Sequence, residues 1–434
     1  MNAFLEKVKK KGDLLGLESV KNLFAELGNP QERLSAVQVV GTNGKGSVCC
    51  YLSQILREAG FRVGRFTSPQ VFSYEERFVA DGEPVTAEEM EAVLAEIEAA
   101  YHSLETKKMA LPTIFEVEVA TAVLFFLRRE CDLVIMEAGM GGDLDATNVF
   151  SEPLLAVFTA IGLDHTQFLG ETAEEIAGHK AGILKAGEWA VSSWQDEAVE
   201  KVLRESFASV GQKRAPGEDS LRKLPGQFMI ADRKKLSMEQ YEPLTFSYGK
   251  WKQMILGMQG DYQVENAVTA LLAVEALQEQ GYAISDEAVR QGLFAARWQG
   301  RMERLDTTRP VYLDGAHNPP AARALAETIR RQFAGQRITF VIGMLADKAY
   351  REVLSILLPA AYHVVAVTPP SERALEAKEL AAAAKEWTDV PVAVAEDIPE
   401  AVRLTEEFAD DVVVAAGSLT ILAECKKVFL GGGQ

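Results

Sequence analysis

The chain has 434 residues and a formal net charge of −18, with 48% hydrophobic and 25% charged residues. Its length predicts two domains, and its acidity disfavours nucleic acid and anionic membranes as partners. No apolar run reaches the roughly 18 residues of a membrane span. The basic N-terminus lacks the apolar stretch of a secretory signal and the four cysteines form no CxxC pair. We therefore expect a cytoplasmic protein with reduced thiols.

The first half of the chain alternates apolar strands with capped helices. Continuous apolar stretches predict strands at residues 37–40, 61–67, 131–136 and 154–161. A glycine-rich loop at 41–47 follows the first strand and leads into a helix that ends near Gly60. Capping-box patterns, which mark helix starts, occur at Thr86 with Glu89, Thr113 with Glu116, and Thr172 with Glu175. This alternation predicts a mostly parallel α/β sheet.

The second half begins with a less regular segment. Residues 210–260 mix proline, glycine and charge with short alternating stretches, which predicts peripheral β structure. Helices are expected near 263–280 and 285–296. Further strands, each followed by a helix, are expected at 310–314, 337–343, 362–368, 391–395 and 411–416. This pattern predicts a second, smaller doubly wound domain, with the two domains at 1–297 and 298–434.

The loop at 41–47 has the context of a phosphate-binding loop, because it joins a strand to a helix. Its glycines would let backbone N–H groups turn towards phosphate oxygens at the helix N-terminus. Lys45 would then reach the β- and γ-phosphates, and Ser47 would offer its hydroxyl to Mg²⁺. The spacing departs from the usual loop, since Val39 stands where a glycine is expected and Gly46 separates Lys45 from Ser47. An ordinary glycine-rich turn remains the alternative.

Groups suited to a metal follow three of the predicted strands. Ser68 and Glu137 close or directly follow apolar runs, and Asp164 and His165 follow the run that ends at Ile161. Ligands in open α/β sheets bind beyond the carboxyl ends of strands. Each residue alone is more typical of a turn or cap, but together they predict ligands to a phosphate-bound metal. Lys180, one helical stretch beyond His165, would on its own be read as a solvated lysine.

These segments, taken in order, resemble the Mur ligase superfamily and most closely its folylpolyglutamate synthase/dihydrofolate synthase branch. The resemblance covers nearly the whole chain and rests on residues 41–47, 67–69, 137–142, 144–148, 163–165, 180–183, 265–267, 300–301, 314–319, 347–348 and 417–418. It implies a P-loop-containing, mostly parallel sheet domain and a smaller Rossmann-like C-terminal domain. It also implies an ATP-dependent ligase that adds L-glutamate to a tetrahydrofolate polyglutamate, to dihydropteroate, or to both, through an acyl phosphate.

The resemblance assigns roles to individual residues. It implies that ATP contacts Thr42, Asn43, Gly44, Lys45, Gly46, Ser47, Asn266, Arg301 and Asp314. It implies two Mg²⁺ ions held by Ser47, Ser68, Glu137, His165 and Lys180, the last as a carbamylated lysine. The folate would border Phe115, Leu144, Asp145, Ala146 and Thr147. Lys45 and Lys180 would be catalytic, as would His317, which would orient or deprotonate the amine unless it is a structural turn histidine.

Four positions depart from the pattern of that branch, and three other functions stay open. The departures are Gln70, Asp143, His179 and Tyr262. A peptidoglycan-type Mur ligase shares the chemistry but should carry an N-terminal substrate domain, for which there is no room before Val37. A P-loop GTPase or kinase would not need the second domain, and a non-catalytic nucleotide-binding regulator would not need Lys180. We expect a monomer whose partners are small-molecule substrates.

Overall fold

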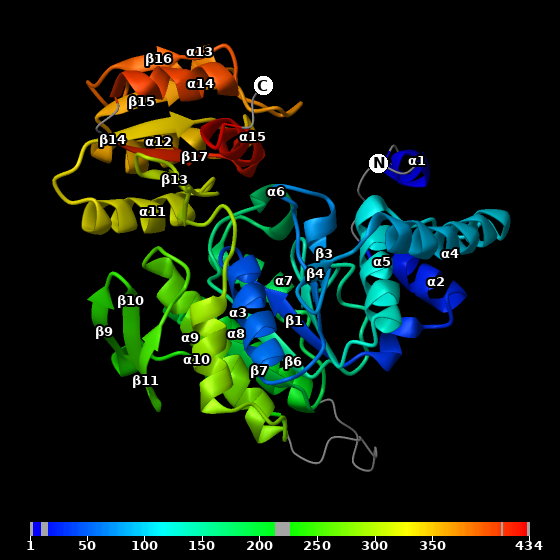
Figure 1. Ribbon diagram of the computed structural model, residues 1–434. Coiled ribbons are helices and arrows are strands. Elements are labelled where there is room, and N and C mark those ends of the chain that lie inside the picture. Colours follow the sequence, from blue (N-terminus) through cyan, green and yellow to red (C-terminus); the bar gives the residue numbers. More distant parts are fainter. Residues whose placement is uncertain (1–2, 10–15, 213–225, 409–410, 432–434) are drawn as a thin grey trace. The chain divides into compact units, whose positions relative to one another are not determined.

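The computed structural model describes residues 3–9, 16–212, 226–408 and 411–431 (Figure 1). The chain divides into two compact units, which are described separately. The first comprises Met1–Ser237, Ser247–Ile255 and Glu265–Ala296. The second comprises Met238–Phe246, Leu256–Val264 and Arg297–Gln434.

The first unit is built on an eight-stranded sheet. Its strands are β1 (Ala36–Val40), β2 (Val63–Phe66), β3 (Phe78–Ala80), β4 (Glu83–Pro84), β5 (Leu133–Glu137), β6 (Leu155–Phe158), β7 (Trp189–Ser192) and β8 (Phe228–Ile230). They lie in the order β4-β3-β2-β5-β1-β6-β7-β8, in which β3 and β4 form an antiparallel edge and the others run parallel. The carboxyl ends of β1, β5 and β6 therefore meet at one edge of the sheet.

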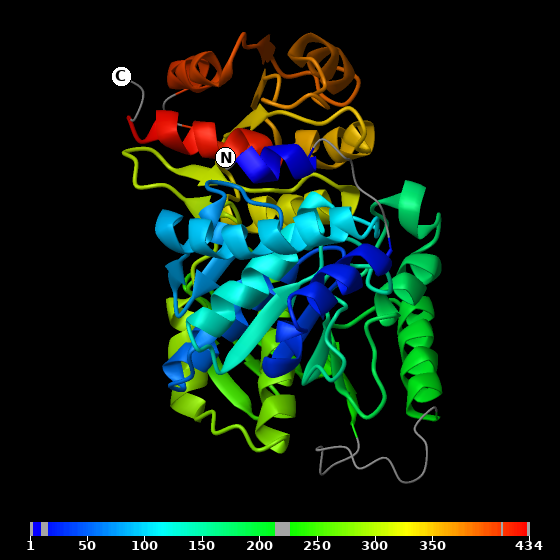
Figure 2. The ribbon, with the colours of Figure 1, turned by 90° about the vertical axis from the view of Figure 1, so that its right-hand side faces the viewer.

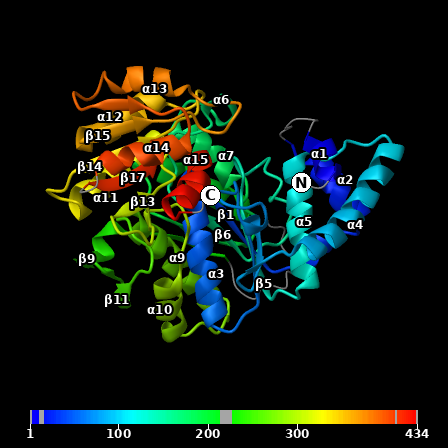
Figure 3. The ribbon, with the colours of Figure 1, turned by 45° about the horizontal axis from the view of Figure 1, so that its top comes forward.

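Helices cover both faces of this sheet. They are α1 (Ala3–Lys9), α2 (Glu18–Glu26), α3 (Lys45–Glu58), α4 (Ala87–Thr106), α5 (Ile114–Arg128), α6 (Thr166–Leu169), α7 (Ala173–Ala181), α8 (Glu197–Gln212), α9 (Tyr262–Glu279) and α10 (Asp286–Ala295). Helix α3 packs against β1, β2 and β5 with α10 beside it, while α5, α7 and α8 lie on the other face. Figure 2 shows α2, α4 and α5 (blue to cyan) layered over that second face, and Figure 3 shows α1 beside them.

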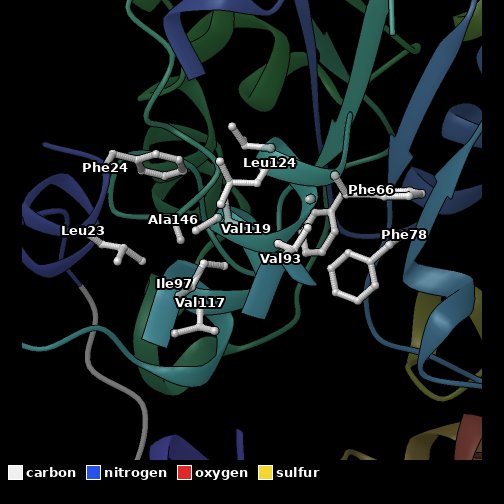
Figure 4. Close-up of a cluster of buried hydrophobic side chains, with 14 of the residues drawn as sticks. Leu23, Phe24, Phe66, Phe78, Val93, Ile97, Val117, Val119, Leu124 and Ala146 are labelled. Carbon is white, nitrogen blue, oxygen red and sulfur yellow. The ribbon is translucent and has the colours of Figure 1, made fainter. Parts of the chain in front are cut away.

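The core beneath α5 is apolar and closely packed (Figure 4). Phe66 from β2 and Phe78 from β3 meet with ring centroids 5.6 Å apart, and both side chains are fully buried. Val117 and Val119 of α5 and Ile97 of α4 fill the space beside them. Burial of such side chains contributes about 1.5–3 kcal/mol each, so this layer holds α5 firmly over the sheet.

The expected helix starts of the first unit are confirmed. Helices α4, α5 and α7 each begin with a complete capping box, in which the threonine side chain accepts from the glutamate N–H and the glutamate accepts from the threonine N–H. The peripheral β structure expected at 210–260 is also present, apart from 213–225, which lie outside the described residues. A three-stranded sheet in the order β11-β10-β9 is formed by β9 (Leu236–Tyr241), β10 (Leu244–Tyr248) and β11 (Trp251–Ile255).

The second unit is a six-stranded sheet in the order β12-β13-β17-β14-β15-β16. Its strands are β12 (Glu303–Arg304), β13 (Val311–Leu313), β14 (Ile338–Ile342), β15 (His363–Ala366), β16 (Val392–Val394) and β17 (Val412–Ala416), of which only β12 pairs antiparallel. The helices are α11 (Pro319–Gln332), α12 (Tyr350–Leu357), α13 (Ala377–Ala384), α14 (Ile398–Thr405) and α15 (Leu419–Phe429). Helices α11, α12 and α13 share one core on one face, whereas α14 and α15 contact β14, β15 and β17 outside that core. Helices thus cover both faces, as the predicted doubly wound architecture requires. No helix in the described part of the chain is both long and apolar enough to cross a membrane.

An ionic cluster around the buried Asp411 joins three strands of the second unit at their amino-terminal ends. Asp411 is fully buried and accepts hydrogen bonds from Thr339 (2.8 Å) and His363 (2.9 Å), while Arg337 lies 2.8 Å from its other oxygen. Burial on its own would raise the pKa of Asp411, but the two hydrogen bonds and the Arg337 charge together bring it below its usual value. The charged carboxylate therefore stabilises the fold.

We expect Asp411→Asn to lower the free energy of unfolding by about 2–3 kcal/mol at neutral pH, because Thr339 and His363 lose a charged, buried acceptor and Arg337 loses its ion-pair partner. Since the pKa of Asp411 is lower in the folded than in the unfolded protein, this contribution is present above a pH of about 4 and is lost as pH falls through the folded-state pKa. Urea unfolding at pH 7 and pH 3.5 measures it, with the exposed Asp389→Asn as control. A pH-independent difference would contradict the argument.

Candidate functional site

The glycine-rich loop connects β1 to α3 at the carboxyl edge of the first sheet. Gly41 (φ +156°) and Gly44 (φ +87°) both lie outside the range that side chains favour. A β-carbon at Gly41 would meet the Thr159 hydroxyl at 1.8 Å, and one at Gly44 would meet the Asn266 side-chain oxygen at 2.2 Å. Both glycines are therefore required by close neighbours as well as by backbone geometry.

Residues that follow β6 hold the glycine-rich loop by hydrogen bonds. The amides of Thr42 and Asn43 donate to the Ala160 carbonyl at 2.8 and 3.2 Å, and the Thr159 hydroxyl donates to the Asn43 carbonyl at 2.7 Å. Gln195 in turn donates to the Thr159 carbonyl at 2.9 Å. Thr159 and Gln195 carry no local sequence signal for this role, because only the pairing of β6 beside β1 brings them to the loop.

Two lysines from distant parts of the chain converge on this loop. Lys45 starts α3, and its Nζ donates to the carbonyls of Gly41 at 3.2 Å and Thr42 at 3.4 Å. Lys180 comes from the last turn of α7, and its Nζ donates to the same Gly41 carbonyl at 2.9 Å. The structure thus brings together the two lysines that sequence analysis proposed as catalytic.

Lys180 is buried, with an exposed fraction of 4%, and is not the solvated lysine that its sequence context alone would suggest. Burial, with repulsion from Lys45 as the second cause, lowers the pKa of Lys180 to about 7, while Asp145 and Asp164 act in the opposite direction. A lysine in this state is partly neutral at physiological pH, which makes its amine nucleophilic.

The first proposed metal ligands lie close to the loop. Glu137 is the last residue of β5, pairs in register with Val39 of β1 and is buried. Ser47 is buried in the first turn of α3. No cluster of three or more His, Cys, Asp or Glu side chains that could hold a metal occurs among the described residues.

The other two proposed ligands sit in less enclosed positions. Ser68 follows β2 and is half-buried, and His165 is exposed at the start of α6. His165 adopts a left-handed conformation (φ +52°), which is uncommon for a residue with a side chain. Its amide donates to the Asp164 carboxylate at 2.9 Å, which fixes the turn after β6.

The proposed folate-binding segment is a loop folded around the Asp145 carboxylate. Asp145 accepts from the Met140 amide at 2.8 Å, from the Thr147 amide at 2.9 Å and from the Thr147 hydroxyl at 2.5 Å. Asp145, Ala146 and Thr147 are buried, whereas Leu144 is 44% exposed. Phe115 packs against this loop, since a β-carbon at Gly139 would lie 2.7 Å from its ring.

Two of the departures from the resembled family contact each other. His179 Nδ1 lies 3.0 Å from Asp143 Oδ2, and the Asp143 amide donates to the His179 carbonyl at 2.9 Å. A β-carbon at Gly182 would lie 2.3 Å from Asp143, so the loop fits tightly onto the end of α7. The pair ties the proposed folate loop to the helix that carries Lys180, a link that the sequence analysis did not identify.

In the second unit, the turn after β13 holds a buried carboxylate. Asp314 is 2% exposed and accepts hydrogen bonds from the Met302 amide, the Ala316 amide and the Tyr262 hydroxyl. Burial raises the pKa of Asp314, and the Arg301 charge is the strongest opposing cause. Arg301 lies beside it, since its Nη1 would be 2.1 Å from a β-carbon at Gly315.

His317 follows directly in the same turn. Its Nδ1 lies 2.8 Å from the Gly315 carbonyl oxygen, which can only accept a hydrogen bond. Nδ1 therefore carries the proton, and Nε2 is the basic nitrogen of the neutral ring. The next residue, Asn318, caps α11 by accepting from the Ala321 amide at 3.0 Å, so the histidine is fixed between a strand end and a helix start.

Comparison with known proteins places these features in a family. Residues 39–274 match the model of the Mur ligase middle domain, and residues 300–419 match that of the Mur ligase, glutamate ligase domain. The chain is 36% identical over 419 residues to a dihydrofolate synthase/folylpolyglutamate synthase of Bacillus subtilis, which covers 95% of this chain and 94% of that protein.

Two solved structures are similar over nearly the full length. The folylpolyglutamate synthase of Mycobacterium tuberculosis, complexed with ADP and AMPPCP, superposes with a TM-score of 0.86 at 29% identity and covers 99% of this chain and 98% of that one. Escherichia coli FolC in complex with DHPP and ADP superposes with a TM-score of 0.84 at 29% identity and covers 100% and 97%.

Proposed function

The chain belongs to the Mur ligase family, in the branch of dihydrofolate and folylpolyglutamate synthases, and on that premise we propose that it joins L-glutamate to a folate carboxylate at the expense of ATP. The proposed substrates are dihydropteroate, a tetrahydrofolate polyglutamate, or both, and the products are the amide, ADP and phosphate. The observation that carries the proposal is the meeting of Lys45 and Lys180 at the Gly41 carbonyl, beside Glu137.

The proposed first step makes the carboxylate reactive. A carboxylate oxygen of the folate attacks the γ-phosphorus of ATP, the bond to the β-phosphate oxygen breaks, and an acyl phosphate and ADP result. Lys45, at the start of α3, would hold the β- and γ-phosphates, with the amides of 42–47 around them. Catalysis at this step is mainly positioning and electrostatic stabilisation of phosphate charge.

Mg²⁺ is part of the proposal, and the residues present fit it if Lys180 is carbamylated. Ser47, Ser68, Glu137, His165 and Lys180 would hold it. Burial of Ser47, Glu137 and Lys180 at one sheet edge supports this set, and a carbamate would supply the anionic oxygen that Mg²⁺ prefers. When bound, the ion would neutralise phosphate charge.

The proposed second step forms the amide. The α-amine of glutamate attacks the acyl carbon, phosphate leaves, and the amine loses a proton. His317 is suited to orient the amine or accept that proton, because its Nδ1 is engaged by Gly315 and its Nε2 is the basic nitrogen. Arg301, Asp314 and Asn266 would contact the nucleotide, with Asp314 at the ribose.

The folate loop is proposed to work through its exposed tip. Leu144 would contact the pterin with Phe115, while the buried Asp145, Ala146 and Thr147 would shape the loop beneath it.

We further propose a cytoplasmic, monomeric enzyme. Its four cysteines are all free thiols, which supports a reducing compartment.

A substrate panel tests this function. We expect ADP release when the protein receives ATP, glutamate and either dihydropteroate or tetrahydrofolate, and none when a UDP-muramoyl substrate replaces the folate. Mass spectrometry should show the folate gaining one glutamyl residue. ADP release only with the UDP-muramoyl substrate would point to a peptidoglycan-type ligase, and ATP binding without turnover on any substrate would point to a regulator.

A further inference from the structure

Tyr262 carries a hydroxyl that the proposed chemistry leaves without a role. It donates to Oδ2 of Asp314 at 2.6 Å, and both residues belong to the second unit. The Met302 amide donates to the same oxygen at 2.9 Å, and the Ala316 amide donates to Oδ1 at 2.9 Å. Asp314 thus accepts one hydrogen bond from a side chain, that of Tyr262, and two from backbone amides.

The tyrosine is itself held firmly in place. Gly260 has a φ of +98°, and a β-carbon there would lie 2.9 Å from the Tyr262 ring. The next residue, Asp261, forms an ion pair with Arg331 of α11, and its amide donates to the Thr328 hydroxyl at 3.2 Å. The turn that starts α9 is therefore fixed to α11, and the Tyr262 hydroxyl has little freedom to leave Asp314.

The distribution of donors orients the carboxylate. Oδ2 of Asp314 receives two donors and Oδ1 receives one, while a carboxylate oxygen has room for two. Oδ1 is therefore the atom that retains capacity for a ligand hydroxyl. Because the carboxylate is buried, losing one of its donors would both free it to rotate and disfavour its charged form.

We propose that Tyr262 is a positioning residue for nucleotide binding, which holds Asp314 so that Oδ1 accepts a ribose hydroxyl. This inference rests on the proposed nucleotide role of Asp314. It assigns no contact between Tyr262 and the nucleotide. The hydroxyl affects the nucleotide only by orienting Asp314, and the ring places the hydroxyl beside that carboxylate.

The test is Tyr262→Phe, which removes the hydroxyl and keeps the ring. We expect ADP affinity, measured by titration calorimetry, to fall about tenfold, because a hydrogen bond to a charged group is lost. KM for ATP should rise by a similar factor, while KM for the folate changes little. In an Asp314→Ala background, where no carboxylate remains to be positioned, Tyr262→Phe should change ADP affinity less than twofold.

Tyr312→Phe is the matched control, because Tyr312 is a buried tyrosine of the same core, on β13. ADP affinity within twofold of wild type in Tyr262→Phe, or an equal loss in both phenylalanine variants, would overturn the inference and leave the proposed ligase function standing. Unchanged ADP affinity in Asp314→Ala would overturn the nucleotide role of Asp314 and the inference with it. The ligase function itself fails only in the substrate panel.

Discussion

Replacing Lys45 by alanine is expected to abolish ADP formation and leave the fold intact. The Lys45 amine donates to the backbone carbonyls of Gly41 and Thr42, and the side chain is not among the buried residues of the core, so we expect its removal to leave the packing intact. The phosphates, in contrast, would lose the cation that the start of α3 presents to them. Loss of one such preorganised group costs about a hundred- to a thousandfold in rate, and we expect at least the upper end here. A coupled assay for ADP release measures it.

The control for this prediction is Lys201→Ala, on an exposed face of α8, where the lysine pairs only weakly with Glu205 at 4.0 Å. That variant should keep full activity, and both variants should keep the wild-type melting temperature. Near-normal turnover by a well-folded Lys45→Ala protein would show that the loop at 41–47 is not the catalytic phosphate site.

Local patterns made much of the fold predictable. The strand, glycine-rich loop and helix from β1 to α3 are consecutive in sequence, so their order alone indicates the phosphate-binding turn. The capping boxes at Thr86, Thr113 and Thr172 are fixed by residues three positions apart, and all three form as predicted. Strands β13, β14, β15 and β17 of the second unit are mostly buried apolar runs followed by helices, which periodicity locates to within a few residues.

Local patterns could not predict which strands lie side by side or which distant residues meet. In the first sheet β5 lies between β2 and β1, an order that no local signal specifies. Lys45 and Lys180 share the Gly41 carbonyl although 135 positions separate the two lysines in the sequence (180 minus 45). In the sequence these residues are related only through a family resemblance, whereas their meeting at Gly41 follows from the packing of α7 beside β6.

The residues that depart from the family pattern also form contacts that the sequence alone does not reveal. Asp143, His179 and Tyr262 could be recognised one by one as unusual, but not as members of pairs. In the structure, Asp143 meets His179 and Tyr262 meets Asp314. A single sequence cannot reveal such pairs, because the partners lie 36 and 52 positions apart and on different elements.

As an ammonium ion, Lys180 would place a positive charge in a buried position beside a second lysine. It is buried, its pKa is lowered to about 7, and Lys45 repels it. Against a divalent ion at about 4 Å, one more positive charge would cost roughly 8 kcal/mol at an effective dielectric near 20. Reaction of the neutral amine with CO₂ would give a carbamate, releasing one proton and replacing the cation by an anion.

We therefore expect Lys180→Ala to be nearly inactive and to regain part of its activity in the presence of short-chain carboxylic acids such as acetate. The carboxylate would occupy the vacated space and supply the missing anionic oxygen. Activity of the wild-type protein should also fall when bicarbonate and CO₂ are rigorously removed.

Lys185→Ala separates this explanation from a general effect of removing a buried lysine. Lys185 is also partly buried with a lowered pKa, but its Nζ donates to the Asn148 side chain at 2.7 Å. Any loss of activity in that variant should not respond to acetate, since no anion is missing there. Turnover by Lys180→Ala at the wild-type rate, with neither acetate nor CO₂ having an effect, would show that Lys180 is an unmodified structural lysine. Partial rescue confined to Lys180→Ala, together with CO₂ dependence of the wild type, is the outcome that the shared Gly41 carbonyl and the burial of this side chain predict.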